Sequence, residues 1–497
     1  MRQPKSLGKT TFVGVVATAL QTLLGVGSGL FGQLAAAYFL TPEHFATVAL
    51  ALTVVSVTSV LQSAGLAEVL VNRRKAFRAW LPYGQHLAVR LGLLAGGLTI
   101  MMSPLAASVY QDNKLVPLCC VFALAQILHG FSVTPTTRLQ NQLKFVWLAK
   151  SRLASSVTAA VLLVLCSVLG LGAFSFGISR VGQGAVFTAL VLWVSGADRS
   201  SFNPVLKHPK RKWFLMKEAS LLMLVSATAT VCLQADYFAL RRYHSVVDVG
   251  LYYFAFTIAG RTAQLIGGSV SSVIQPVLAS TQTDPGRQSS ITVRMIRMIA
   301  AVGYPLTFLQ AAAIPMIFHQ ALPTKWIPSI EMAQILSIGM GANMVCGIGW
   351  GLLKVQRRVG TLLALNAVAA TIFVVAALVL AKIGTPIWVA VLVVVHCLVY
   401  TQILVGIVHQ SLQLGWLRSL SCSGGYMAIA GILALLLWQL TDFGQATTLS
   451  RLPAFILQSV VYLLGCYSLL CAFDRGLIQE FRPALSKFSA KFRLGSS

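Results

Sequence analysis

The residues of this chain best suited to chemistry lie in one apolar stretch, residues 250–276, which carries Arg261 near its middle. Positions three and four apart share a face of a helix, so the polar side chains of this stretch should form one stripe. Its members are Tyr253, Thr257, Arg261, Gln264, Gly268, Ser271 and Gln275. A guanidinium near the centre of a bilayer is costly unless it meets water or a partner. We therefore predict that Arg261 faces a wet cavity and, with Tyr253, Thr257 and Gln264, contacts a substrate.

Two further arginines, Arg90 and Arg180, lie inside predicted membrane spans. Guanidinium groups bind phosphate oxygens in pairs and stay charged when they are partly desolvated. A chain with several arginines and few acids within its spans therefore favours an anionic cargo. We expect Arg90 and Arg180 to act as entry and exit contacts for the cargo that Arg261 binds.

Two acidic residues within the spans, Asp236 and Glu331, are candidates for binding a coupling proton or sodium ion. Either carboxylate could instead only neutralise an arginine. The structural alternative for Arg261 is an ion pair with a carboxylate, such as that of Asp236, that holds two helices together. At the level of sequence, both interpretations of Arg261 stay open.

Motifs typical of enzymes and of nucleotide-driven pumps do not occur in the sequence. There is no GxxxxGK[ST] or HExxH pattern, and the Ser, His and Asp residues do not fall into a catalytic arrangement. The nine cysteines lie in or beside apolar segments without CxxC spacing, as small buried side chains do. We therefore expect no catalytic residue, no metal site and no cofactor, and a protein that is not an enzyme.

The composition places the chain in a membrane. Of its 497 residues 57% are hydrophobic and 10% charged, and the mean hydropathy is +0.78, whereas soluble domains carry about 25% charged residues. The net charge of +26 would suggest nucleic acid in a soluble protein. Here most Lys and Arg gather in every second loop, which predicts cytoplasmic termini and contact with anionic phospholipids rather than a nucleic-acid partner.

The fold class predicted is all-α and integral to the membrane, with about fourteen transmembrane helices. The sequence LAAAYFLTPEHF at 34–45 is echoed by LQADYFALRRYH at 233–244, six spans later. Copies that point the same way across a membrane imply two lobes with a site between them. We expect an N-lobe of spans 1–6 (1–197), a cytoplasmic linker (198–212), a C-lobe of spans 7–12 (213–410), and two appended spans with a basic tail (411–497).

Three features carry a family resemblance: SAGLAEVLVNRR at 63–74, the run ADYFAL…VGLYYFAFTIAGR…VIQPVLAS over spans seven and eight, and the number of spans. In these features the chain resembles the Wzx-type flippases, in the polysaccharide transporter branch of the multidrug/oligosaccharidyl-lipid/polysaccharide exporter (MOP) superfamily. The resemblance implies two six-helix lobes, like those of MATE transporters, around a cationic cavity. Arg261, Asp236 and the corner at 250–253 fit the hairpin of that family.

The function that this resemblance implies is the movement of undecaprenyl-diphosphate-linked oligosaccharide repeat units across the bacterial inner membrane by alternating access. Such a flippase would serve exopolysaccharide, capsule or O-antigen synthesis. Its expected partners are the lipid-linked oligosaccharide, a proton or sodium ion, a polysaccharide polymerase and a chain-length regulator. The alternatives are a MATE-like cation-coupled exporter of small molecules, a lipid II-type flippase, and a membrane-embedded polymerase or ligase.

Overall fold

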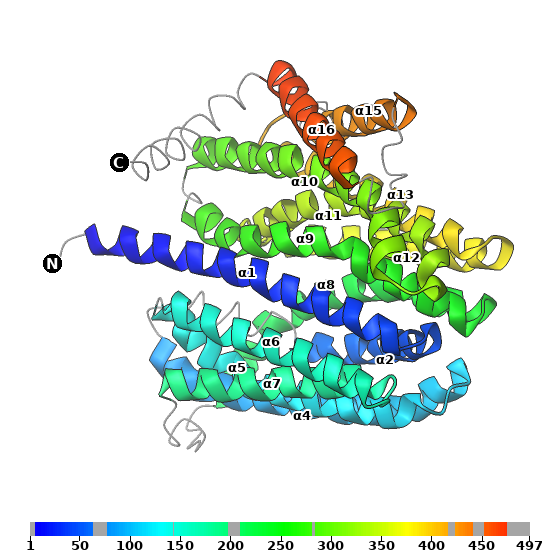
Figure 1. The fold of residues 1–497 in the computed structure, drawn as a ribbon. Coiled ribbons are helices and arrows are strands. Elements are labelled where there is room, and N and C mark those ends of the chain that lie inside the picture. The colour runs from blue at the N-terminus through cyan, green and yellow to red at the C-terminus, as the bar shows by residue number, and fades with distance from the viewer. Residues whose placement is uncertain are drawn as a thin grey trace, which may run out of the picture. The chain divides into compact units, whose positions relative to one another are not determined.

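The computed structural model describes residues 5–62, 77–142, 144–196, 209–280, 284–415, 423–440 and 452–474. These residues form fourteen α-helices and no strand (Figure 1). In chain order the helices are α1 (Lys5–Phe39), α2 (Pro42–Ser59), α4 (Phe77–Tyr110), α5 (Leu115–Asn141), α6 (Phe145–Val168), α7 (Phe174–Ser195), α8 (Pro209–Tyr243), α9 (Val246–Ser280), α10 (Pro285–Ala321), α11 (Ile330–Val355), α12 (Val359–Ile383), α13 (Pro386–Ser411), α15 (Gly425–Leu440) and α16 (Leu452–Phe473). The short 3₁₀ turns are η1 (Val60–Gln62) and η4 (Thr324–Ser329).

Each predicted span coincides with one of these helices, which confirms the all-α fold class. Within the described residues, twelve helices are long and apolar enough to cross a membrane, so the protein is a multi-pass membrane protein. The other two are α9, which has 35 residues and carries the polar stripe, and the shorter α15. The stretch at 63–74 that carries part of the family resemblance, most of the linker at 198–212, and the tail beyond 474 lie outside the described residues.

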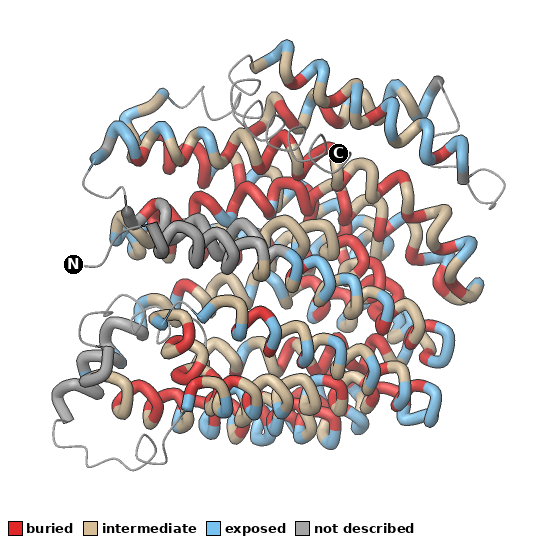
Figure 2. Tube along the Cα trace, turned by 60° about the vertical axis from the view of Figure 1, so that its left-hand side comes forward, coloured by how far each residue is buried: buried red, intermediate tan, exposed pale blue. Residues whose placement is uncertain are grey.

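The helices divide between two compact units. Unit 1 consists of Met1–Arg261, Leu322–Ser329 and Arg357–Leu392, and unit 2 of Thr262–Ala321, Ile330–Gln356 and Val393–Ser497. The boundary between them therefore falls within α9, directly after Arg261. Figure 2 shows buried and exposed positions alternating along single helices, as helices with one packed side require. The predicted lobes, with their boundaries at 197 and 213, stay a prediction.

In unit 1, α1 packs on α6, α6 on α7, α7 on α5 and α5 on α4, while α12 packs on α8. A buried polar network joins α2, α4 and α5. Gln126 accepts a hydrogen bond from Thr99 Oγ1 at 2.7 Å and donates one from Nε2 to Thr58 Oγ1 at 2.9 Å. All three side chains are buried. Because amide and hydroxyl groups need partners in an apolar interior, this network fixes how the three helices are rotated against one another.

An aromatic cluster joins four segments of unit 1, namely α2, α7, α9 and η4. Its members are Phe45, Phe176, Tyr253, Phe254 and Trp326. The Trp326 ring lies 4.8 Å from Phe45 and 4.2 Å from Phe254, measured between centroids, and is fully buried. The cluster fixes the start of α2 against the start of α9.

The residues of η4 also complete the end of α1. Trp326 Nε1 donates to the carbonyl oxygen of Ala37 at 2.9 Å, and Lys325 Nζ donates to that of Tyr38 at 3.1 Å. The last four carbonyls of a helix have no partner within it, and a cation there also complements the helix dipole. A segment almost 290 positions further along the chain therefore supplies the C-terminal cap of the first helix.

Unit 2 is built around α10, which stays helical through Pro305 and Pro315. A proline lacks the N–H that would bond the carbonyl four residues earlier, so Pro315 leaves the oxygen of Ala311 without its helical donor. Gln334 of α11 supplies a replacement, because its Nε2 donates to Ala311 O at 3.1 Å. The interrupted backbone is thus satisfied by a neighbouring helix, as apolar surroundings demand.

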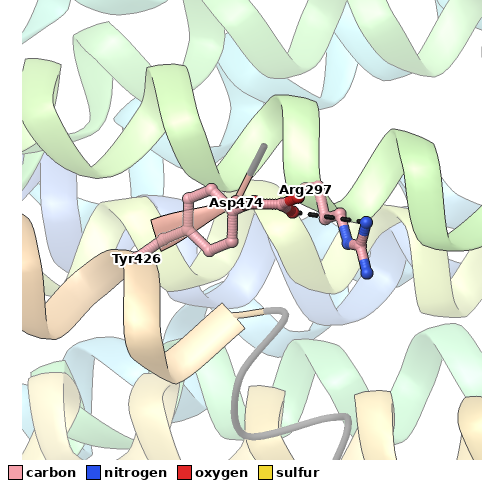
Figure 3. Close-up of polar contacts among 3 residues, drawn as sticks. All are labelled: Arg297, Tyr426 and Asp474. Carbon is pink, nitrogen blue, oxygen red and sulfur yellow. Dashed lines mark hydrogen bonds and ion pairs between the residues drawn. The ribbon is translucent and has the colours of Figure 1, made fainter. Parts of the chain in front are cut away.

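The C-terminal helices α15 and α16 pack on α10, and one carboxylate adds polar contacts between them, as Figure 3 shows. Asp474 directly follows α16 and lies 3.2 Å from Arg297 Nη1 of α10. The same carboxylate accepts a hydrogen bond from Tyr426 Oη of α15 at 2.7 Å. One carboxylate therefore connects α10, α15 and α16.

The fold predicts a strong effect of substituting Gly250. A Cβ added at this position would lie 1.8 Å from the carbonyl oxygen of Pro42, which is backbone and has little room to move. We expect Gly250→Ala to lower the free energy of unfolding by about 3 kcal/mol, because it overpacks the contact between α9 and α2. Thermal melting of the purified protein in detergent measures this effect.

Gly27→Ala is the matched control, since a Cβ there would meet nothing within 4 Å. This variant should melt at or slightly above the temperature of the unmodified protein, because alanine favours a helix. Equal melting temperatures for the two variants would contradict the packing described for Gly250.

Candidate functional site

The candidate site is centred on Arg261, fifteen residues into α9 and thus about 22 Å along the helix axis. The side chain is partly buried, and its Nη2 donates a hydrogen bond to Oε1 of Gln33 on α1. Gly29, one turn before Gln33, leaves space at the other end of the guanidinium: a Cβ there would lie 3.6 Å from Arg261 Nη1. The guanidinium therefore lies against one face of α1.

Thr257 and Tyr253 lie one and two turns before Arg261 on the same side of α9. Thr257 Oγ1 accepts a hydrogen bond from Gln33 Nε2 at 2.6 Å. The ring of Tyr253 belongs to the aromatic cluster and also lies 6.0 Å from that of Tyr237. Three of the residues predicted from the stripe thus share one side of α9, and Gln33 of α1 bonds two of them, Thr257 and Arg261.

Arg180 of α7 approaches the same region. Its side chain is exposed, and Nη1 donates to Gln183 Oε1 at 3.4 Å. Its charge acts on both Tyr253 and Arg261, so the two guanidinium groups are electrostatic neighbours. Two cations from different helices of unit 1 therefore contribute to one local field, which attracts anions.

The remaining predicted contacts lie elsewhere. Arg90 is exposed on α4, and among the described residues no hydrogen bond or ion pair joins it to Arg261, Arg180 or Gln33. Gln264 is exposed on α9 within unit 2. Glu331, also in unit 2, is exposed in the first turn of α11, where a carboxylate complements the helix dipole.

Asp236 does not form the predicted ion pair with Arg261. Its side chain is 2% exposed, and Oδ2 accepts a hydrogen bond from Tyr252 Oη at 2.7 Å. Oδ1 accepts one from the backbone N–H of Tyr237 at 2.9 Å. Asp236 is therefore not the carboxylate partner of Arg261, because its two oxygens accept hydrogen bonds from Tyr252 and Tyr237.

Gln33 is the residue of this site that reasoning from buried charge overlooks, since an amide carries none. The available signal was the polar and small residues of α1, among which Gly25 and Gly32 pack against Ser156 and Ala160 of α6. Gly29 and Gln33, four positions apart, lie instead toward α9. Sequence spacing alone does not say which neighbour each face meets.

Comparison with known proteins identifies the family. A family model described as "Polysaccharide biosynthesis protein" matches residues 36–331, more than half of the chain. The chain is 24% identical over 315 residues to the succinoglycan biosynthesis transport protein ExoT of Rhizobium meliloti (strain 1021), and the match covers 62% of each protein. It is 20% identical over 347 residues to the lipopolysaccharide biosynthesis protein WzxC of Escherichia coli (strain K12), covering 67% of each. The match thus spans less than two thirds of ExoT.

Solved structures show the fold. The lipid II flippase MurJ, in an inward closed conformation, superposes with a TM-score of 0.67 at 13% identity, covering 94% of this chain and all of that one. An inward-facing MATE family multidrug transporter of the MOP superfamily superposes with a TM-score of 0.59 at 13% identity, covering 81% and 98%. These likenesses confirm the MOP-like fold that the sequence predicts.

The geometry at Asp236 predicts different effects for two neighbouring tyrosines. Tyr252→Phe removes the hydroxyl that donates to the buried carboxylate, and we expect a loss of about 1–3 kcal/mol of stability. Tyr253→Phe is the control, because its hydroxyl makes no hydrogen bond within the described residues. Melting temperatures in detergent should fall for the first variant and change little for the second; equal changes would contradict this arrangement.

Proposed function

Because this chain belongs to the family of polysaccharide biosynthesis proteins, we propose that it is a flippase for a lipid-diphosphate-linked oligosaccharide. Its cargo would be undecaprenyl-diphosphate-linked repeat units, moved across the bacterial inner membrane by alternating access, with both termini of the protein in the cytoplasm. The names of ExoT and WzxC, which refer to succinoglycan transport and lipopolysaccharide biosynthesis, support a cargo destined for a surface polysaccharide.

One observation carries the proposal: Arg261, within an apolar helix, is held by a neutral amide and lies in the field of Arg180. An amide partner accepts a hydrogen bond from the guanidinium without adding negative charge, which suits a site that binds an anion. A diphosphate offers oxygens that match the fork of N–H donors on arginine.

The proposal assigns a role to each of the predicted residues. Arg261 binds the diphosphate, and the exposed Arg180 attracts it. Tyr253 and Thr257, which belong to unit 1 as Arg261 does, contact the sugars next to it. Arg90, exposed on α4 apart from this group, is assigned to the path by which the cargo enters. The polymerase and chain-length regulator expected with such pathways would act on the product and need not touch these residues.

Asp236 is the better candidate for a coupling proton. It is buried, and its hydrogen bonds come from Tyr252 and from a backbone N–H rather than from a cation. A carboxyl group in this setting can gain or lose a proton without breaking an ion pair. Glu331 is exposed at a helix N-terminus, where the helix dipole accounts for its presence.

A lipid II-type flippase is the second candidate, favoured by the superposition on MurJ over 94% of this chain. Its cargo carries the same diphosphate, so Arg261 would have the same role in both. The two functions are separated in cells: loss of a surface polysaccharide on deletion supports the first, and a block in cell-wall synthesis supports the second. A change in drug tolerance alone would favour a small-molecule exporter.

We expect Arg261→Ala to reduce polysaccharide export at least tenfold in cells while the protein still inserts into the membrane. Arg261→Lys should retain part of the activity, because lysine keeps a charge but lacks the planar fork of donors. Surface polysaccharide per cell is the measurement, normalised to the amount of membrane-inserted protein. Arg242→Ala, at the exposed end of α8, is the control and should export normally. Normal export by Arg261→Ala would overturn the proposed function.

Asp236→Asn tests the coupling. Asparagine mimics the protonated side chain and can keep the hydrogen bond to Tyr252, so the variant should fold. We expect export to fall severalfold and to become insensitive to dissipation of the proton gradient. Glu331→Gln, the matched change at the other candidate, should export normally and keep its response to the gradient. The reverse pattern would assign the coupling to Glu331.

A further inference from the structure

Gln33 is a buried amide six residues before the C-terminal end of the glycine-rich helix α1. Its side chain is 3% exposed. Burying an amide without hydrogen bonds costs free energy, so both ends of this group need partners. It finds them on α9, where Thr257 and Arg261 stand one turn apart. The amide therefore bridges the turn of α9 from Thr257 to Arg261, which lies at the centre of the candidate site.

The orientation of the amide is set by Thr257. The single hydroxyl hydrogen of Thr257 is directed at backbone carbonyls of its own helix, with Oγ1 lying 3.0 Å from Tyr253 O and 2.9 Å from Phe254 O. The Thr257 oxygen can therefore only accept, and it takes Gln33 Nε2 as its donor at 2.6 Å. The carbonyl end of the amide is left facing Arg261, whose Nη2 donates to it.

The chemical type of this partner matters for binding an anion. A carboxylate at the position of the Gln33 oxygen would form an ion pair with the guanidinium and compete with a phosphate for it. An amide oxygen accepts the same hydrogen bond but leaves the charge of the guanidinium in place. Gly29 adds to this effect, because the absence of a side chain there keeps space beside Arg261 Nη1.

We propose that Gln33 is a positioning residue that fixes the orientation of the Arg261 guanidinium for a phosphate group without neutralising its charge. This inference rests on the proposed function, since it assumes that Arg261 meets a diphosphate. Gln33 itself acts through Arg261. Holding a binding group in its productive orientation before the ligand arrives lowers the cost of binding.

The proposal predicts an unusual order among variants of Gln33. Gln33→Glu keeps the size of the side chain and its contact with Arg261, yet it should weaken the binding of pyrophosphate at least tenfold and reduce export to a similar degree. Gln33→Met keeps the shape but loses the acceptor, and should weaken pyrophosphate binding about threefold to tenfold. If Gln33 only packed α1 against α9, the order would be reversed. Gln33→Glu would then bind pyrophosphate about as well as the unmodified protein does.

The test uses the full-length protein in detergent, with inorganic pyrophosphate as the probe and the rise in melting temperature as the measure of binding. Gln21→Glu, which adds the same charge twelve residues earlier on α1, is the control and should retain the response to pyrophosphate. A normal response by Gln33→Glu overturns the proposal. If that variant does not fold, Gln33→Met is tested in its place. A normal rise in its melting temperature with pyrophosphate would also overturn the proposal.

Export in cells separates this inference from the proposed function. Loss of export in Arg261→Ala together with normal export in both Gln33 variants would overturn the positioning role alone. Normal export in Arg261→Ala would overturn the proposed function and this inference with it. Loss of export in both Arg261→Ala and Gln33→Glu, with Gln21→Glu normal, is the expected result.

Discussion

The arrangement around Arg261 depends on one constraint: within apolar helices, each polar group has to find its hydrogen-bond partner in the protein. Unit 1 meets this constraint with neutral side chains that reach between helices. Gln33 connects α1 to α9, and Gln126 connects α2, α4 and α5. Because each bond needs a particular rotation of its helix, a few amides and hydroxyls determine how helices of similar apolar surface are turned. The same hydrogen bonds that set the rotation of the helices thus also place the charge of Arg261 at the site.

The same constraint explains unit 2. Pro315 removes a backbone donor from α10, and Gln334 of α11 replaces it at Ala311. Near the other end of α10, Asp474 joins Arg297 to Tyr426 and so attaches the two C-terminal helices. In the first arrangement a side chain of one helix bonds a backbone carbonyl of another that has lost its donor. In the second a carboxylate at the end of one helix pairs with a charged side chain of another. Irregular or charged positions are therefore where these helices recognise one another, since the apolar side chains between them discriminate little.

How much the sequence predicts depends on the range of the interaction. The fourteen helices and the common face of Tyr253, Thr257 and Arg261 follow from hydropathy and helical spacing, which are local. Gln33 lies 224 positions from Thr257, and nothing local indicates that this face of α1 meets α9. The proposed pair of Arg261 with Asp236 does not form for the same reason. Opposite charges indicate possible partners, but they do not determine how α8 is rotated and therefore where Asp236 points. Trp326 was missed because its partners lie on α1, α2 and α9.

The cap that η4 places on α1 has a consequence for how the protein is made. Ala37 and Tyr38 leave the ribosome early, whereas Lys325 and Trp326 are synthesised only after about two thirds of the chain. Unit 1 also needs residues up to Leu392 before all its segments exist. The first helix must therefore reside in the membrane with an unfinished terminus while the eight helices from α2 to α10 are inserted. Such late, long-range closure is slow, and it makes the nascent N-terminal half dependent on lipid, water or an insertase until its last piece arrives.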